Sequence, residues 1–149
     1  LLSRVLRRWA KAARTTWKKN ASPQRSRKNM ERGDCRQFLL LTVGDEPAGF
    51  CSYCRSRDAD ADSTTGEVQS IYLLKTYQHR GYGRALMERA LTELQQMGMQ
   101  RVTLWVLSTN RQAIAFYERC EFATDGAVKE QVIGSPVTEL RMGRTLSPR

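Results

Sequence analysis

The clearest candidates for chemistry are two glycines two positions apart, Gly81 and Gly83, in the stretch QHRGYG that begins at Gln78. Glycine lets the backbone turn tightly and approach a ligand closely. Main-chain N–H groups at such a turn, followed by the N-terminus of a helix, attract an anion such as a phosphate. The stretch lacks the third glycine of a dinucleotide-binding loop, and no Gly-Lys-Ser/Thr follows it. The sequence therefore predicts an anion-binding turn of another type.

This turn falls between a predicted strand and a predicted helix. Alternating and continuous apolar runs indicate strands, and apolar residues recurring every three or four positions indicate helices. A series of strands and helices attached to a β-hairpin is typical of an α/β or α+β fold with a mixed sheet. The predicted strands cover residues 37–43, 48–57, 67–74, 101–107, 122–133 and 137–142, and the predicted helices cover 83–97 and 111–121.

The charge of the chain is unevenly distributed. The 149 residues include 25 Lys and Arg and 15 Asp and Glu, a formal net charge of +10, and this length fits one domain. Residues 1–36 hold 12 of the basic and two of the acidic side chains, whereas residues 37–149 have no net charge. Apolar spacing predicts a first helix that continues through Trp17 and Lys18, and a second over 24–33. Nucleic acid is therefore not expected as a partner of the domain body.

The cysteines and the single histidine do not indicate a metal site or a thiol nucleophile. Cys51 and Cys54 form a C-x-x-C pair within a predicted strand, where residues three apart point to opposite faces. No second Cys/His pair accompanies them, so no metal is expected. His79, the only histidine, lies in the glycine turn. We expect buried, reduced thiols in a cytoplasmic protein without a membrane span.

Two segments resemble motifs of the general-control-related N-acetyltransferases, the GNAT superfamily. The pattern Q-x-x-G-x-G after a strand ending in IYLL is similar to motif A of that family. Residues 108–122 are similar to motif B, which usually reads N-x-x-A-x-x-F-Y-x-x-x-G-F. We place the one departure, a missing glycine, at Cys120. The matching residues of motif B are Asn110, Ala113, Phe116, Tyr117 and Phe122.

The resemblance, which covers about residues 37–142, implies the GNAT fold. This is an α/β (α+β) fold in which helices flank a central mixed, mostly antiparallel twisted sheet of about six to seven strands. It also implies a single N-acetyltransferase domain over residues 1–149. Within it, 1–36 form basic N-terminal helices, 37–142 form the acetyl-CoA-binding core and 143–149 form a tail. The family's first strand, which normally precedes the N-terminal helices, is not found in the sequence.

The same resemblance implies acetyl-CoA as co-substrate and no metal. The main-chain N–H groups of residues 79–84 would hold the pyrophosphate, with charge added by Arg80 and Arg84. The pantetheine arm would pair with the strand before the turn, and a main-chain N–H there would polarise the thioester carbonyl. The implied binding residues are Ile71, Tyr72, Leu73, Gln78, His79, Arg80, Gly81, Tyr82, Gly83, Arg84, Asn110 and Tyr117.

The implied reaction is direct attack of a primary amine on the thioester. A lysine-like amine, with a pKa of about 10.4, needs about 4.6 kcal/mol to be neutral at pH 7, so a general base is useful. Glu67 is the candidate base, because it lies 11 positions before Gln78, similar to the glutamate of the family's histone acetyltransferases. Tyr117 matches the tyrosine that commonly protonates the departing CoA thiolate.

Two functions from different classes stay open. The first is a cytoplasmic N-acetyltransferase that acts on an unidentified amine of a small molecule or protein. For it we expect Tyr53 or Tyr72 to line the acceptor pocket, Trp105 to lie in the core, and the last strands to form a homodimer. The second is a non-catalytic GNAT-like scaffold whose basic N-terminal helix binds nucleic acid or a membrane surface.

Overall fold

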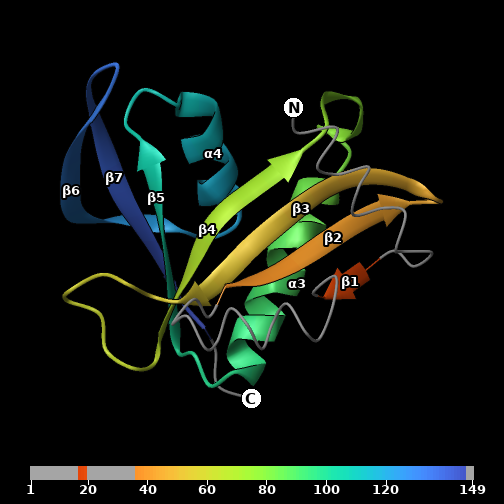
Figure 1. The fold of residues 1–149 in the computed structure, drawn as a ribbon, viewed down its shortest axis with the longest axis horizontal. Helices are drawn as coiled ribbons and strands as arrows, with labels where there is room; N and C mark the ends of the chain where they lie inside the picture. Colours follow the sequence, from red (N-terminus) through yellow and green to blue (C-terminus); the bar gives the residue numbers. More distant parts are fainter. Residues whose placement is uncertain (1–16, 20–35, 147–149) are drawn as a thin grey trace.

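The computed structural model describes residues 17–19 and 36–146, and its centre is a seven-stranded sheet (Figure 1). The strand order is β1-β2-β3-β4-β5-β7-β6, with β4 and β5 parallel and all other neighbours antiparallel. The predicted mixed, mostly antiparallel sheet is therefore confirmed. The elements are β1 (Trp17–Lys19), β2 (Gln37–Val43), β3 (Glu46–Arg55), β4 (Thr65–Leu73), the 3₁₀ helix η1 (Lys75–Tyr77), α3 (Tyr82–Gln96), β5 (Arg101–Leu107), α4 (Arg111–Arg119), β6 (Ala123–Ile133) and β7 (Ser135–Thr145).

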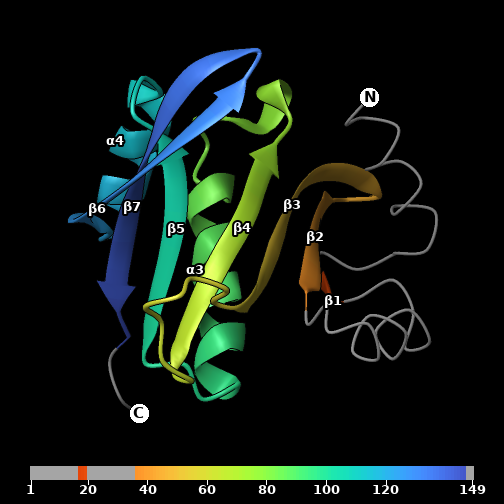
Figure 2. The same cartoon turned by 60° about the vertical axis from the view of Figure 1, so that its left-hand side comes forward.

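The core lies between the sheet and the two helices. Leu86, Ala90 and Leu94 recur on one face of α3 and are fully buried against the strands. Residues of α4 pack against the same core cluster, and Figure 2 shows both helices on one side of the strands. Among the described residues, no helix is long and apolar enough to cross a membrane. The opposite face of the sheet, over β4 to β7, carries no described helix.

The parallel strands β4 and β5 stay together for only three residues. Their pairing ends with Glu67 opposite Thr103. Beyond that point β4 continues beside β3 as far as Leu73, and β5 continues beside β7, so the two strands diverge (Figure 1). Glu67 therefore lies at the vertex of a V-shaped opening in the sheet.

The structure corrects the prediction at Trp17 and Lys18, which we expected at the end of the first basic helix. They belong to β1, which pairs with β2 with Trp17 opposite Leu41. Helical spacing failed here because the edge of β2 offers backbone hydrogen-bonding groups, and pairing with them outweighs local periodicity. The rest of the predicted basic helices lies outside the described residues.

At the C-terminal end of α4, the position where motif B usually has glycine is Glu121, one residue after Cys120, where we predicted it. Cys120 has a φ of −86°, whereas Glu121 has a φ of +66° and takes the left-handed conformation. The N–H of Phe122 donates to Tyr117 O at 3.0 Å, and the N–H of Glu121 donates to Glu118 O at 2.9 Å. These two bonds define a Schellman motif, in which glycine is the usual left-handed residue.

Replacing Glu121 with glycine is expected to stabilise the protein. A non-glycine residue in the left-handed region costs about 1 kcal/mol or more. Glu121 recovers part of that through an ion pair with Arg144 at 3.1 Å, but its side chain is 68% exposed, so the pair is weak. We expect Glu121→Gly to raise the free energy of unfolding by about 1 kcal/mol in urea denaturation. Glu121→Ala, which loses the ion pair and keeps the strain, is the control and should be the less stable of the two.

Candidate active site

The glycine turn ends in an uncapped helix N-terminus. Gly81 has a φ of +87° and is the N-cap residue of α3, and no side chain caps the helix there. The first bond of the helix runs from Ala85 N to Gly81 O, and the first turn contains no acidic residue. Arg80 and Arg84 are exposed on either side. Free N–H groups, the positive end of the helix dipole and two cations suit a phosphate.

The second glycine of the turn serves packing. A Cβ at Gly83 would lie 3.1 Å from Cε2 of Phe116, so the first turn of α3 rests directly on α4. Tyr117 follows Phe116 on α4, and their rings lie 5.5 Å apart. This contact therefore fixes the distance between the turn and the candidate catalytic tyrosine.

The end of β4 connects to the turn through a side chain. Gln78 Nε2 donates to Leu73 O at 3.1 Å, which joins the turn to the last residue of the strand. Ile71 and Leu73 pack against the core beneath the helices. Tyr72 faces the other way and lies beside Phe50, with ring centroids 6.1 Å apart.

The remaining residues of the predicted cofactor site lie at the same end of the sheet. His79 is exposed and has a φ of +62°. The ring of Tyr82 packs edge-on against Tyr77 at 5.9 Å. Asn110 is the N-cap of α4, where its Oδ1 accepts from Ala113 N at 3.2 Å. This hydrogen bond gives Asn110 a structural role beside the binding role that the sequence predicts.

Tyr117 is held as a protonated phenol. It is half-buried, and its ring packs against Phe116 and Phe122. Burial raises the pKa of Tyr117 to about 12. At neutral pH its hydroxyl therefore carries a proton and can donate it.

Glu67 is buried, and among the described residues one group donates directly to its carboxylate. The residue is 6% exposed, and the N–H of Arg57 donates to its Oε2 at 3.4 Å. Burial raises the pKa of Glu67 above its usual value. The charge of Asp58 raises this pKa further, whereas those of Arg57 and Lys129 lower it. A buried carboxylate with a raised pKa, at the opening between two strands, is suited to accept a proton.

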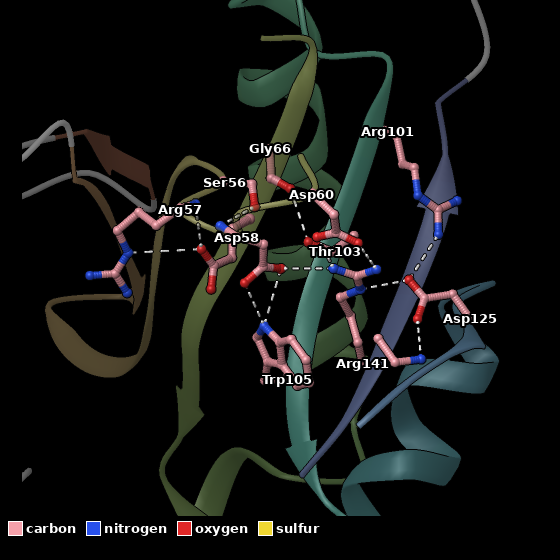
Figure 3. A network of polar contacts seen from close by, with 12 residues as sticks. Ser56, Arg57, Asp58, Asp60, Gly66, Arg101, Thr103, Trp105, Asp125 and Arg141 are labelled. Carbon is pink, nitrogen blue, oxygen red and sulfur yellow. Dashed lines mark hydrogen bonds and ion pairs between the residues drawn. The ribbon is translucent and has the colours of Figure 1, made fainter. Parts of the chain in front are cut away.

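A charged network formed by Arg141 and three aspartates covers the helix-free face near Arg57 (Figure 3). Arg141 of β7 contacts three carboxylates: Asp60 with two bonds of 2.7 Å, Asp125 at 2.7 Å and Asp58 at 3.3 Å. Trp105 Nε1 donates to both oxygens of Asp58 at 3.1 and 3.2 Å. The loop between β3 and β4 is thereby fixed to β5 and β7, although the sequence indicated only an acidic surface loop.

Sequence reasoning missed this network and misplaced two aromatic residues. Trp105 was expected in the core, but it is half-buried on the helix-free face. Tyr53 was a candidate for the acceptor pocket, but it is fully buried in the core. Period-two alternation could have found Trp105, because its neighbours Leu104 and Val106 are the core residues of β5.

The cysteines behave as buried thiols, as predicted. Among the described residues, Cys51, Cys54 and Cys120 are buried, and burial raises the pKa of Cys51 to about 12. A thiol in that state is a poor nucleophile. Within the described part of the chain, no group of three or more His, Cys, Asp or Glu side chains is placed to hold a metal ion.

Comparison with known proteins identifies the class. Residues 4–122 match the family described as the acetyltransferase (GNAT) family, so the chain belongs to that family. An acetyltransferase of Bacillus subtilis, solved in complex with CoA, superposes with a TM-score of 0.63 at 17% identity and covers 87% of each chain. The ribosomal-protein-alanine N-acetyltransferase of Brucella melitensis superposes with a TM-score of 0.67 at 18% identity, over 85% of this chain and 79% of that one.

Curated relatives are longer than this chain. It is 25% identical over 111 residues to a mycothiol acetyltransferase of Propionibacterium freudenreichii, which covers 74% of this chain and 36% of that protein. It is 37% identical over 103 residues to an amino-acid acetyltransferase of Pseudomonas putida, which covers 69% of this chain and 22% of that protein. The chain thus spans less than half the length of these relatives.

Removing the charge of Glu67 is expected to stabilise the protein increasingly as the pH rises. Because burial raises the pKa of Glu67 in the folded state, its stabilising contribution is present at low pH and is lost as the pH rises through that pKa. We expect the free energy of unfolding of Glu67→Gln, relative to that of the unmodified protein, to increase as the pH rises above the usual pKa of a glutamate, about 4.3. Urea denaturation measures it, and the exposed Glu46→Gln is the control. A difference that shrinks as the pH rises would contradict the burial of a charged Glu67.

Proposed function

We propose that this chain is an acetyl-CoA-dependent N-acetyltransferase that acts on a primary amine. The observation that carries the proposal is the V-shaped opening between β4 and β5. It has Glu67 at its vertex, and the uncapped N-terminus of α3 follows the end of β4. Family membership and the CoA-bound structural neighbour support the same activity.

In the proposed reaction, acetyl-CoA supplies a thioester whose carbonyl carbon is attacked by the neutral amine, with release of the CoA thiolate. Glu67 accepts the proton that the amine nitrogen loses, directly or through one water. Tyr117 donates its phenolic proton to the departing sulfur. Main-chain N–H groups of β4 near Ile71 hold the carbonyl oxygen, and those of residues 79–84 hold the pyrophosphate.

The proposal includes a cytoplasmic location and a homodimer. Among the described residues, the free, buried thiols of Cys51 and Cys120 fit a reducing compartment. The homodimer would form through the last strands, since β6 is the edge of the sheet and exposes Val128, Val132 and Ile133. Sedimentation equilibrium tests the homodimer, and a monomer at high protein concentration would contradict it.

Acetyl-CoA is expected to raise the melting temperature, and Gly81→Asp to abolish the increase. A ligand at about 100 times its Kd adds about 2.7 kcal/mol, or roughly 5–10 °C for a chain of this size. An aspartate at Gly81 would place a negative charge where the pyrophosphate is expected. Gly98→Asp is a matched control, because Gly98 lies at the other end of α3 with a φ of +92° and, like Gly81, has open space around its Cβ position. No increase at saturating acetyl-CoA would refute the proposal and favour a non-catalytic scaffold.

Glu67→Gln and Tyr117→Phe are expected to lower kcat by different amounts. Loss of a general base costs about 10²-fold or more. Loss of the Tyr117 hydroxyl should cost less, about tenfold, because a thiolate leaves readily without a proton. Steady-state release of free CoA thiol measures both variants. Tyr53→Phe, which removes a hydroxyl from the core, is the control, and unchanged kcat in both active-site variants would rule out the assigned roles.

A further inference from the structure

The acidic side chains around Glu67 on the helix-free face are already bound within the protein. Asp58 accepts from Trp105 and Arg141, and Asp60 receives two parallel bonds from the same guanidinium. Asp125 binds Arg141 at 2.7 Å and Arg101 at 3.4 Å (Figure 3). Each of these carboxylates therefore already has a cation of the protein as its partner.

Two cations near Glu67, Arg57 and Lys129, have side chains that are exposed to solvent. Arg57 has a side chain that is 66% exposed, and its guanidinium Nε lies 3.9 Å from Glu67 Oε2, too far for a hydrogen bond. Lys129 is exposed on β6, with its ammonium 4.5 Å from the centre of the Trp105 ring. Glu139, opposite Lys129 in the β6–β7 register, instead accepts from Gln131 at 3.2 Å. Within residues 36–146, Lys129 makes no ion pair with a carboxylate.

The position of these cations suggests what they bind. Arg57 lies 3.9 Å from Glu67, and Lys129 lies over the ring of Trp105, whose N–H donates to Asp58, the residue that follows Arg57. They come from separate elements, the β3–β4 loop and β6, and Trp105 lies between Lys129 and Asp58. Arginine and lysine are the side chains suited to a carboxylate, and a guanidinium can bind one with two parallel hydrogen bonds.

We propose that the acceptor is a small amino carboxylate, of which an α-amino acid is the simplest form. Arg57 and Lys129 bind its carboxylate while its amine faces Glu67. The inference rests on the proposed N-acetyltransferase function. The geometry fits because a single carbon separates the amine from the carboxylate in an α-amino acid, and Arg57 and Glu67 are immediate neighbours. A polyamine would instead meet the cations Arg57 and Lys129, next to aspartates that already bind Arg141.

The test compares acceptors that differ only in the carboxylate. Release of CoA thiol is followed with each common α-amino acid and, beside it, its α-carboxamide. The amine of the carboxamide has a lower pKa than that of the amino acid, so a larger fraction of it is neutral and reactive at pH 7. A preference for the amino acid therefore reports recognition of the carboxylate and not a higher concentration of neutral amine. For the preferred amino acid we expect kcat/KM to exceed that of its carboxamide by at least about tenfold, the size of one charge-assisted hydrogen bond.

Variants assign the preference to the two side chains. Arg57→Gln and Lys129→Gln should each reduce the acid-to-carboxamide ratio of kcat/KM by about tenfold, mainly through KM of the acid. A change in the basicity of Glu67 affects both members of a pair and leaves the ratio unchanged. Arg119 is an exposed cation on α4, which packs on the other face of the sheet. Arg119→Gln is therefore the matched control and should leave the acid-to-carboxamide ratio unchanged.

The outcomes separate this inference from the proposed function. Equal kcat/KM for acids and carboxamides, no turnover of any α-amino acid by a protein that binds acetyl-CoA, or an unchanged ratio in both variants would overturn the inference alone. Absence of acetyl-CoA binding in the unmodified protein would instead overturn the proposed function. Melting-temperature shifts with acetyl-CoA, measured on each variant, establish that Arg57→Gln and Lys129→Gln still bind the co-substrate.

Discussion

The early end of the β4–β5 pairing is the constraint on which the rest of the site depends. Three residue pairs hold the strands together, and beyond Glu67 each strand keeps a partner on its outer side only. Among the described residues, no strand pairs with the inner edges there, so backbone groups of β4 before Leu73 O, which accepts from Gln78 Nε2, are available to an extended ligand. The side chain of Glu67 lies where β4 and β5 converge. Glu67 is therefore buried by the two strands and still adjacent to the opening between them.

The two faces of the sheet have different roles around that opening. On one face, α3 and α4 meet through Gly83 and Phe116, which sets the glycine turn and Tyr117 at a fixed separation. On the other, Arg141 ties the β3–β4 loop to β7 and so holds the backbone of Arg57 near Glu67. The site is thus assembled from hydrophobic contact on one side and ionic contact on the other.

Local patterns predicted the elements, and long-range contacts accounted for what was missed. The bounds of β2 and β5 follow directly from their apolar runs, and the glycine turn lies between the strand and helix that the sequence predicted. Strand β1 could not be predicted because its helical spacing gives no sign of the partner strand. Arg141 and Asp58 are 83 positions apart, so their contact leaves no local signal. The left-handed residue after α4 is Glu121 and not a glycine, so the sequence gives no sign of the left-handed conformation there.

The geometry of Arg141 also restricts how this sequence can change over time. One guanidinium binds three carboxylates, so losing Arg141 first would leave Asp58 and Asp60 without that cation and Asp125 with its longer contact to Arg101. Losing any of the acids first would leave the arginine with two partners. The four positions therefore form an epistatic unit, in which the order of substitutions determines which intermediates are stable. Homologues should differ there by coordinated replacement of the whole set rather than by drift at single positions.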